Sequence, residues 1–231
     1  DVAGRMLSLL PQLNEVRNGG TPDMEFAVSG LLARSQMANG QPADARRTIE
    51  VLRECFAERG LTRFLPNMDA MLCRIDIHTG DLDAADAWYR EKAPREPTHL
   101  NVMRRYQYLT QAMVELADGR PDAALLTLAP LEPYIKNCAR IIDGIHLNVL
   151  TAIALRRKKD ERWRERLTAA LDAATEYRFI RTVSVYGTAV LPLLEALNWD
   201  GDKAWSKRLM AAVRMQAAFY PHFLESRLAP G

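Results

Sequence analysis

Apolar positions recur along the chain with a period of about 40 residues. Three glycines mark the repeat, Gly40, Gly80 and Gly119, and each opens a similar phrase: GQPADARRTIEVL, GDLDAADAWYREK and GRPDAALLTLAPL. Such a period is typical of helical-repeat proteins, in which each repeat contributes a pair of helices. One further step of 39 residues reaches Lys158, where the glycine is absent but the apolar pattern continues. We therefore predict helical hairpins that turn at these glycines and near Lys158.

The same positions are apolar or small in every hairpin. In the second helix they are the fifth and ninth residues after the turn: Ala45, Ala85, Ala124 and Trp163, then Ile49, Tyr89, Leu128 and Leu167. In the first helix they are the seventh and eighth residues before it: Ala33, Cys73, Ala112 and Thr151, then Leu32, Leu72, Gln111 and Leu150. We expect the stripe on the second helices to be buried, and each turn glycine to end the first helix in a left-handed conformation.

Start and stop signals place the helices around these turns. Thr21 followed by Pro22 predicts a capped helix that runs to about Ala38. Pro42 and Pro121 predict the starts of two second helices, because a proline at the first helical position loses no hydrogen bond. Breaker residues predict the connections back to the next hairpin. They are Gly60 and Pro66, Pro94 and Pro97, and Pro133.

Three segments follow from this pattern. Residues 1–20 are expected to complete a preceding, truncated repeat, residues 21–176 to hold the repeats of about 40 residues, and residues 177–231 to form a degenerate terminal helical pair. The short strand-like run at residues 181–186 is interpreted as helical. The predicted fold is all-α, a right-handed helical-repeat solenoid of about ten helices. Because the first residue is Asp, we expect the sequence to be part of a longer protein.

Composition and charge limit the classes of partner and the compartment that fit this sequence. Hydrophobic residues make up 48% and charged residues 26% of the 231 residues, as in ordinary globular proteins. A net charge of +2 creates no large field to attract nucleic acid or a membrane, and the apolar runs fall short of the roughly 18 residues that span a bilayer. The three cysteines are odd in number and lack the spacing of metal ligands. A reduced, cytoplasmic compartment is therefore expected.

Motifs for catalysis are absent from the sequence. It contains no phosphate-binding loop, dinucleotide fingerprint, HExxH motif or nucleophile elbow, and the four histidines are separated from each other and from cysteine: His78, His99, His146 and His222. We expect no enzyme activity, catalytic residue, metal or cofactor. A basic run at residues 156–166 could bind phosphate or nucleic acid, but it spans an interhelical turn, and a solvated turn is the favoured interpretation.

Candidate ligand-binding residues come from the geometry of stacked hairpins. The first helices of such hairpins line a concave surface, where side chains that do not pack between helices can meet a ligand. Arg34 and Arg74 both stand six residues before a turn glycine, and together they could bind an anion. The alternative is that both are merely exposed or salt-bridged. Three further residues are predicted on the same surface: Asn67, Tyr106 and Asn148.

The repeat phrase resembles the tetratricopeptide repeat (TPR). It has the small residue, the turn glycine, then alanine and a large apolar residue at fixed distances. The segment EYRFIR at residues 176–181, followed by Tyr186-Gly187 and LPLL at 191–194, resembles the end of the sensor region in MalT-like transcriptional regulators of the LuxR family. The family phrase has glycine after its tyrosine, where this sequence has Arg178. The resemblance covers about residues 22–228.

That resemblance implies a TPR-like sensing domain between a nucleotide-binding module and a DNA-binding module. Such a domain is expected to bind a small-molecule inducer or a regulatory protein on its concave face. Its partners would include the other domains of the parent regulator, and it would meet DNA only through a domain absent from this chain. No membrane partner is expected. The alternative is a generic TPR scaffold for protein–protein interaction.

Overall fold

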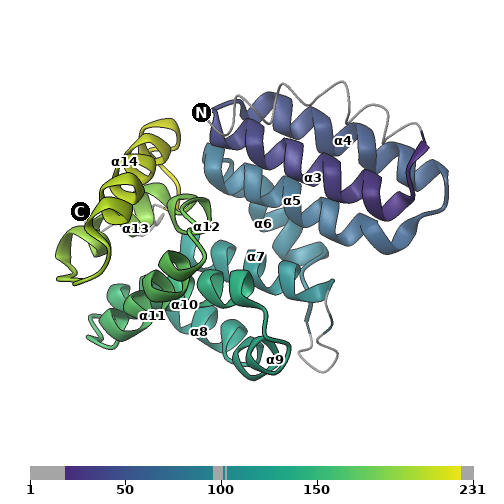
Figure 1. The fold of residues 1–231 in the computed structure, drawn as a ribbon. Helices are drawn as coiled ribbons and strands as arrows, with labels where there is room; N and C mark the ends of the chain where they lie inside the picture. Colours follow the sequence, from purple (N-terminus) through teal and green to yellow (C-terminus); the bar gives the residue numbers. More distant parts are fainter. Residues whose placement is uncertain (1–18, 96–100, 102, 225–231) are drawn as a thin grey trace. The chain divides into compact units, whose positions relative to one another are not determined.

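The computed structural model describes residues 19–95, 101 and 103–224, and its regular secondary structure there is entirely helical (Figure 1). The predicted all-α, TPR-like fold is thereby confirmed. Most of the truncated repeat expected at residues 1–20, as well as Pro97 and His99, lies outside the described residues. The chain divides into two compact units, Asp1–Ile75 and Asp76–Gly231, which are described separately.

The first unit contains α3 (Pro22–Ala38), α4 (Pro42–Glu58), the short 3-10 helix η1 (Thr62–Phe64) and most of α5 (Leu65–Thr79). As predicted, α3 begins with Thr21 as its cap, whose Oγ1 accepts a hydrogen bond of 3.4 Å from the backbone N–H of Met24. The rings of Phe56 and Phe64 meet edge to face at 5.2 Å in the core. Arg53 of α4 pairs with Asp69 of α5 at 2.7 Å.

The second unit continues from the end of α5. Its helices are α6 (Leu82–Glu91), α7 (Arg104–Ala117), α8 (Pro121–Leu128), α9 (Leu131–Asn137), α10 (Ile141–Arg157), α11 (Trp163–Glu176), α12 (Arg181–Ser184), α13 (Gly187–Ala196) and α14 (Lys203–Phe219). Helix α10 is central, because it contacts α7, α8, α9, α11, α12 and α13. Pro133, predicted in a connection, instead lies in the short helix α9.

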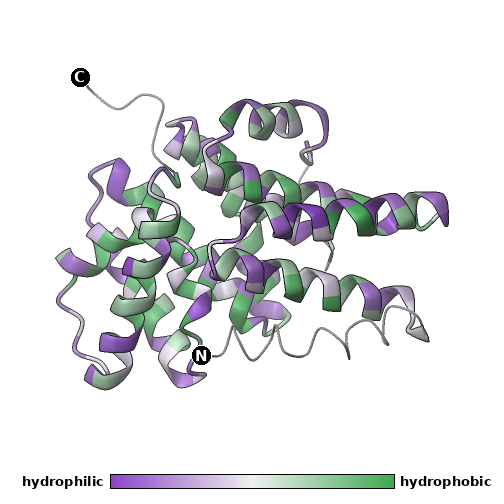
Figure 2. Ribbon diagram, turned by 90° about the horizontal axis from the view of Figure 1, so that it is seen from above, coloured by the Kyte–Doolittle hydropathy of each residue, from purple (hydrophilic) through white to green (hydrophobic). Residues whose placement is uncertain are grey.

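The stripe predicted on the second helices is buried. Seven of its eight residues are at most 2% exposed: Ala45, Ile49, Ala85, Ala124, Leu128, Trp163 and Leu167. Tyr89 is half-buried, and its hydroxyl joins a polar network. Hydropathy alternates between green and purple along the helices in Figure 2, as expected when one face packs and the other meets water.

Left-handed residues end the first helices, as predicted for the glycines. The φ angles of Gly40, Gly80 and Gly119 are 72°, 81° and 69°. The next residue then donates its N–H to a carbonyl five positions earlier, as in the 2.8 Å bond from Arg120 to Glu115. This is the Schellman closure, which satisfies carbonyls that a helix end leaves without partners.

The fourth hairpin departs from the predicted register by one residue. Its left-handed residue is Lys159, with a φ of 58°, and not Lys158. Counted from Lys159, the seventh residue before the turn is Ala152, which is fully buried, whereas Thr151 is half-buried. The first helix thus keeps the small-residue position of the other hairpins. The shift of one residue is confined to the turn.

Backbone geometry explains why glycine suits two positions of the MalT-like phrase. Arg178, which stands where the phrase has glycine, adopts a left-handed φ of 58° after α11. Gly187 begins α13 close to α14, since a Cβ built on it would lie 3.1 Å from the backbone nitrogen of Ala217. The first position therefore needs an unusual φ, and the second needs the absence of a side chain.

Replacing Gly119 by alanine should lower the free energy of unfolding by about 1–2 kcal/mol, because alanine disfavours the left-handed conformation. The matched control is Gly144→Ala in α10, where the new Cβ would meet Ile135 at an ordinary 3.6 Å. This control should be neutral or stabilise by about 0.5–1 kcal/mol. Urea unfolding measures both, and a Gly119→Ala chain as stable as the parent would contradict the role of the turn.

Candidate functional site

Three of the predicted ligand-binding residues lie in the first unit. Arg34 is exposed on α3, where its Nε donates a 3.2 Å hydrogen bond to the carbonyl of Gly30 in the same helix. On α5, Asn67 is buried and Arg74 is half-buried. Asn67 is therefore less accessible to a ligand than the prediction assumed.

The other two predicted residues lie in the second unit. Tyr106 is half-buried on α7. Asn148 is half-buried on α10, and its Oδ1 accepts a 3.3 Å hydrogen bond from Arg166 of α11. A common groove formed by all five residues stays a prediction.

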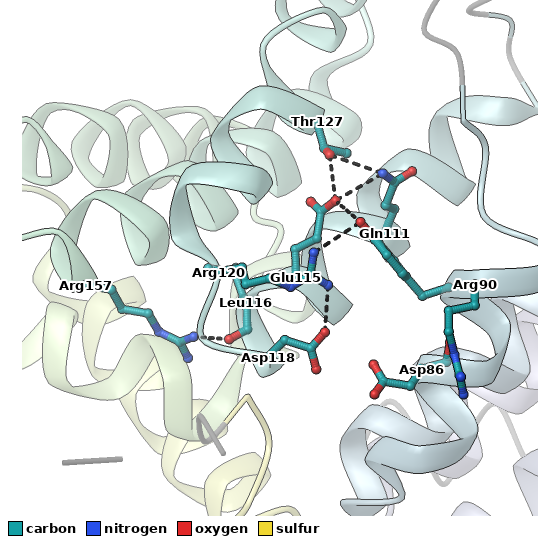
Figure 3. Close-up of polar contacts among 10 residues, drawn as sticks. Asp86, Arg90, Gln111, Glu115, Leu116, Asp118, Arg120, Thr127 and Arg157 are labelled. Atoms are coloured by element: carbon teal, nitrogen blue, oxygen red, sulfur yellow. Dashed lines mark hydrogen bonds and ion pairs between the residues drawn. The ribbon is translucent and has the colours of Figure 1, made fainter. Parts of the chain in front are cut away.

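A polar network that was not predicted lies between α6, α7 and α8 (Figure 3). Its centre is Glu115 of α7, which is only 2% exposed. One carboxylate oxygen, Oε1, accepts hydrogen bonds from the Tyr89 hydroxyl at 3.0 Å, Gln111 Nε2 at 3.1 Å and the Thr127 hydroxyl at 3.0 Å. Buried carboxylates are costly unless they are hydrogen-bonded in this way.

Arg120 connects this network to the turn. Its Nη1 donates to the Tyr89 hydroxyl at 3.2 Å and its Nη2 pairs with Asp118 at 2.7 Å. The guanidinium also lies 4.8 Å from the centroid of the Tyr89 ring, within the range of a cation–π contact. Burial acts to lower the pKa of Arg120, but the hydrogen bonds to Tyr89 and Asp118 outweigh it and raise that pKa. The arginine is therefore always charged.

Two buried acceptors of the network have no hydrogen-bond partner within the described part of the chain: Oε1 of Gln111 and Oε2 of Glu115. The Gln111 amide cannot simply rotate to change this. A carboxylate only accepts, so the NH₂ group of Gln111 must face Glu115 and the amide oxygen must face away. Each unsatisfied acceptor costs about 1–3 kcal/mol, which a ligand with a donor group could recover.

A cleft of about 570 Å³ adjoins the network. It lies along the C-terminal end of α6 and the residues that follow it, with α7 opposite. Its lining residues are Tyr89, Arg90, Ala93, Pro94, Arg95 and Gln111. Tyr89 and Gln111 thus belong both to the cleft wall and to the network around Glu115.

The sequence carried a signal for this site. Gln111 stands at a position that is leucine in the first two hairpins, Leu32 and Leu72. Thr127 is also in register with Thr48, whose hydroxyl donates to Oε1 of Gln36 at 3.0 Å in the first unit. A threonine–acceptor pair therefore recurs, and in the third hairpin the acceptor has become a buried carboxylate.

Arg157 forms a second unusual contact, next to this network. Its guanidinium donates to the backbone carbonyl of Leu116, at the end of α7, and to that of Leu224, after α14. Burial lowers the pKa of Arg157. The segment after α14 is also held by His78, whose ring stacks on Phe223 with centroids 4.1 Å apart.

The basic run of residues 156–166 is largely paired. Four of its seven cations contact carboxylates: Lys158 with Asp122, Arg162 with Asp160, Arg164 with Glu161 and Arg166 with Glu132. Arg157 bonds to carbonyls instead. These contacts favour the interpretation of the basic run as a solvated turn, and they count against a nucleic-acid-binding site. Within the described residues, no group of His, Cys, Asp and Glu could hold a metal ion, and no helix is suited to cross a membrane.

Changing Tyr89 to phenylalanine should lower the free energy of unfolding by about 1–2 kcal/mol, because Glu115 loses a donor and Arg120 loses an acceptor. The control is Tyr177→Phe, since Tyr177 is 44% exposed. It should change stability by no more than about 0.5 kcal/mol. Equal stability of the two variants in urea unfolding would show that the network contributes little.

Asp160 should titrate far below an ordinary aspartate. Hydrogen bonds from the side chain and then the backbone of Arg162 lower the pKa of Asp160 from 3.8 to about 2. A depressed carboxyl pKa adds stability at neutral pH that is lost as the pH falls from about 3.8 to about 2. NMR titration of the side-chain carboxyl should show this pKa, and Arg162→Gln should raise it toward 3.8 while Arg208→Gln leaves it unchanged.

The comparisons with known proteins agree with the repeat pattern. The family model for the MalT-like TPR region matches residues 11–200. No curated protein and no solved structure matches the chain significantly. Because the matched residues make up most of the sequence, the chain belongs to the MalT-like TPR region family.

Proposed function

We propose that this chain is the effector-sensing region of a LuxR-type, MalT-like transcriptional regulator, without enzyme activity of its own. The observation that carries the proposal is the family match over residues 11–200. In this function the hairpins bind a small inducer or a regulatory protein, and the parent regulator responds through its other domains. DNA binding and nucleotide binding belong to those domains, since the sequence holds no phosphate-binding loop.

Sensing requires a ligand to bind two states of the parent protein with different affinities. Buried polar groups without partners can supply such a difference in affinity. A ligand binds more tightly to the state in which it can form hydrogen bonds with them. Within the part of the chain that the structure describes, Gln111 and Glu115 each bury one such acceptor. The same end of α7 bonds through Leu116 to Arg157, and Arg157 also holds the segment after α14. Ligand binding at α7 therefore has a physical connection to a distant part of the unit.

A protein-interaction scaffold is the second candidate, because TPR-type repeats commonly bind other proteins. One observation favours it. The first hairpin exposes three large apolar side chains: Met24, Leu31 and Val51, which are 40–49% exposed. A scaffold would bind a helix or extended peptide through a few anchor residues and would not respond to small molecules.

A thermal-shift screen of the chain against metabolites and against the parent's other domains tests the proposal. For a ligand bound in the predicted groove, Arg34→Ala should weaken binding by about 1.5–3 kcal/mol, because a charge-assisted hydrogen bond is lost. Arg74→Ala should do the same. Arg47→Ala, an exposed arginine on α4, serves as the control and should leave affinity unchanged. Tight binding of a domain or peptide with no metabolite effect would reject the sensing function in favour of the scaffold.

A further inference from the structure

We propose that the cleft beside Tyr89 binds a small organic anion, a carboxylate or phosphate, that also carries hydroxyl groups. The inference deepens the sensing function, on which it rests for its biological meaning, by naming a site and a ligand class. The site differs from the groove predicted from Arg34 and Arg74. The cleft offers three features to such a ligand: an acceptor, a pair of cations and a rigid wall.

The acceptor is the amide oxygen of Gln111. Glu115 and Thr127 hold the NH₂ side of this amide at 3.1 and 3.3 Å, which fixes the oxygen on the opposite side. Among the described residues that oxygen has no hydrogen-bond partner, and it has almost no exposed surface, although Gln111 itself lines the cleft. A small shift of the Gln111 side chain would bring the oxygen to the cleft, where a hydroxyl donor would complete its hydrogen bonding. A ligand that only accepts hydrogen bonds would leave it incomplete.

The cations are Arg90 and Arg95. Both are exposed at the cleft, and neither pairs with a carboxylate of the described residues. Their recorded hydrogen bonds go to backbone carbonyls: Arg90 Nε to Asp86 at 3.4 Å, and Arg95 Nη2 to Arg90 at 2.7 Å. A guanidinium has five N–H donors, so each arginine retains donors for a carboxylate or phosphate.

The wall is the ring of Tyr89, with Ala93 and Pro94 beside it. The hydroxyl of Tyr89 bonds to Glu115 and Arg120, and Arg120 also covers the ring at 4.8 Å. The ring is therefore fixed before a ligand arrives, which reduces the entropy that binding would lose. A volume of about 570 Å³ suits a small metabolite.

Isothermal titration calorimetry of the 231-residue chain tests the inference with four probes. Ribose 5-phosphate and ribonate combine an anion with sugar hydroxyls, whereas ribose has the hydroxyls without the anion and inorganic phosphate is an anion without sugar hydroxyls. We expect each of the first two to bind at least about tenfold more tightly than the last two, because only they engage both ends of the cleft. Equal affinity for phosphate and ribose 5-phosphate, or no binding of either combined probe at millimolar concentration, would overturn the inference.

Variants locate the binding. Arg90→Gln should weaken ribose 5-phosphate by about tenfold or more, whereas Arg208→Gln, an exposed arginine on α14, should change it by less than about twofold. Gln111→Met should remove the preference for ribose 5-phosphate over phosphate. If Gln111→Met lowers the melting temperature too far for calorimetry, the two arginine variants decide. Equal losses in both arginine variants would show non-specific attraction and overturn the site.

The outcomes also separate this inference from the sensing function. If another metabolite binds and its affinity is unchanged by Arg90→Gln, the cleft inference fails and sensing stands. If ribose 5-phosphate binds as expected but no ligand alters the response of the parent regulator, the cleft is a binding site and the sensing function fails.

Discussion

The left-handed residue at the end of each first helix is the constraint on which the hairpins depend. It allows the N–H of the next residue to donate a hydrogen bond to a carbonyl of the first helix, and so it sets where the second helix begins. It also brings together the side chains that flank the turn. In the third hairpin the bond from Arg120 to the carbonyl of Glu115, at 2.8 Å, places an arginine and a carboxylate on the same tyrosine. The polar network is thus a consequence of the turn as well as of its side chains.

Hydrogen-bond direction then determines what the network leaves unused. Arg120 donates to Tyr89, Tyr89 donates to Glu115, and Gln111 donates to Glu115 as well. Every chain of donors ends on the carboxylate, so the unused groups are acceptors. An apolar leucine at position 111, as in the corresponding positions of the first two hairpins, would leave no such acceptor. Burying Gln111 and Glu115 therefore costs stability, because each leaves one acceptor without a partner among the described residues.

The sequence predicted what depends on local chemistry. The turn glycines, the proline starts and the buried stripe follow from backbone preferences and helical periodicity, and they were found in the structure. The shift to Lys159 was missed because a lysine gives no sign that it adopts a positive φ. The network was missed because its members come from three helices, and only Gln111 departed visibly from the repeat. Arg178 likewise adopts a left-handed φ of 58°, which its residue type did not indicate.

Arg157 connects the end of α7 to the segment after α14. The carbonyl end of a helix carries partial negative charge, so a buried cation is stabilised there even without a carboxylate. Arg157 uses this at Leu116, one residue after Glu115, and gives its second bond to Leu224. Because the guanidinium is planar and rigid, both carbonyls must keep their places for both bonds to persist. A rearrangement of the last turn of α7 would therefore weaken the hold on the segment after α14, and a displacement of that segment would in turn leave Arg157 with an unsatisfied charge beside α7.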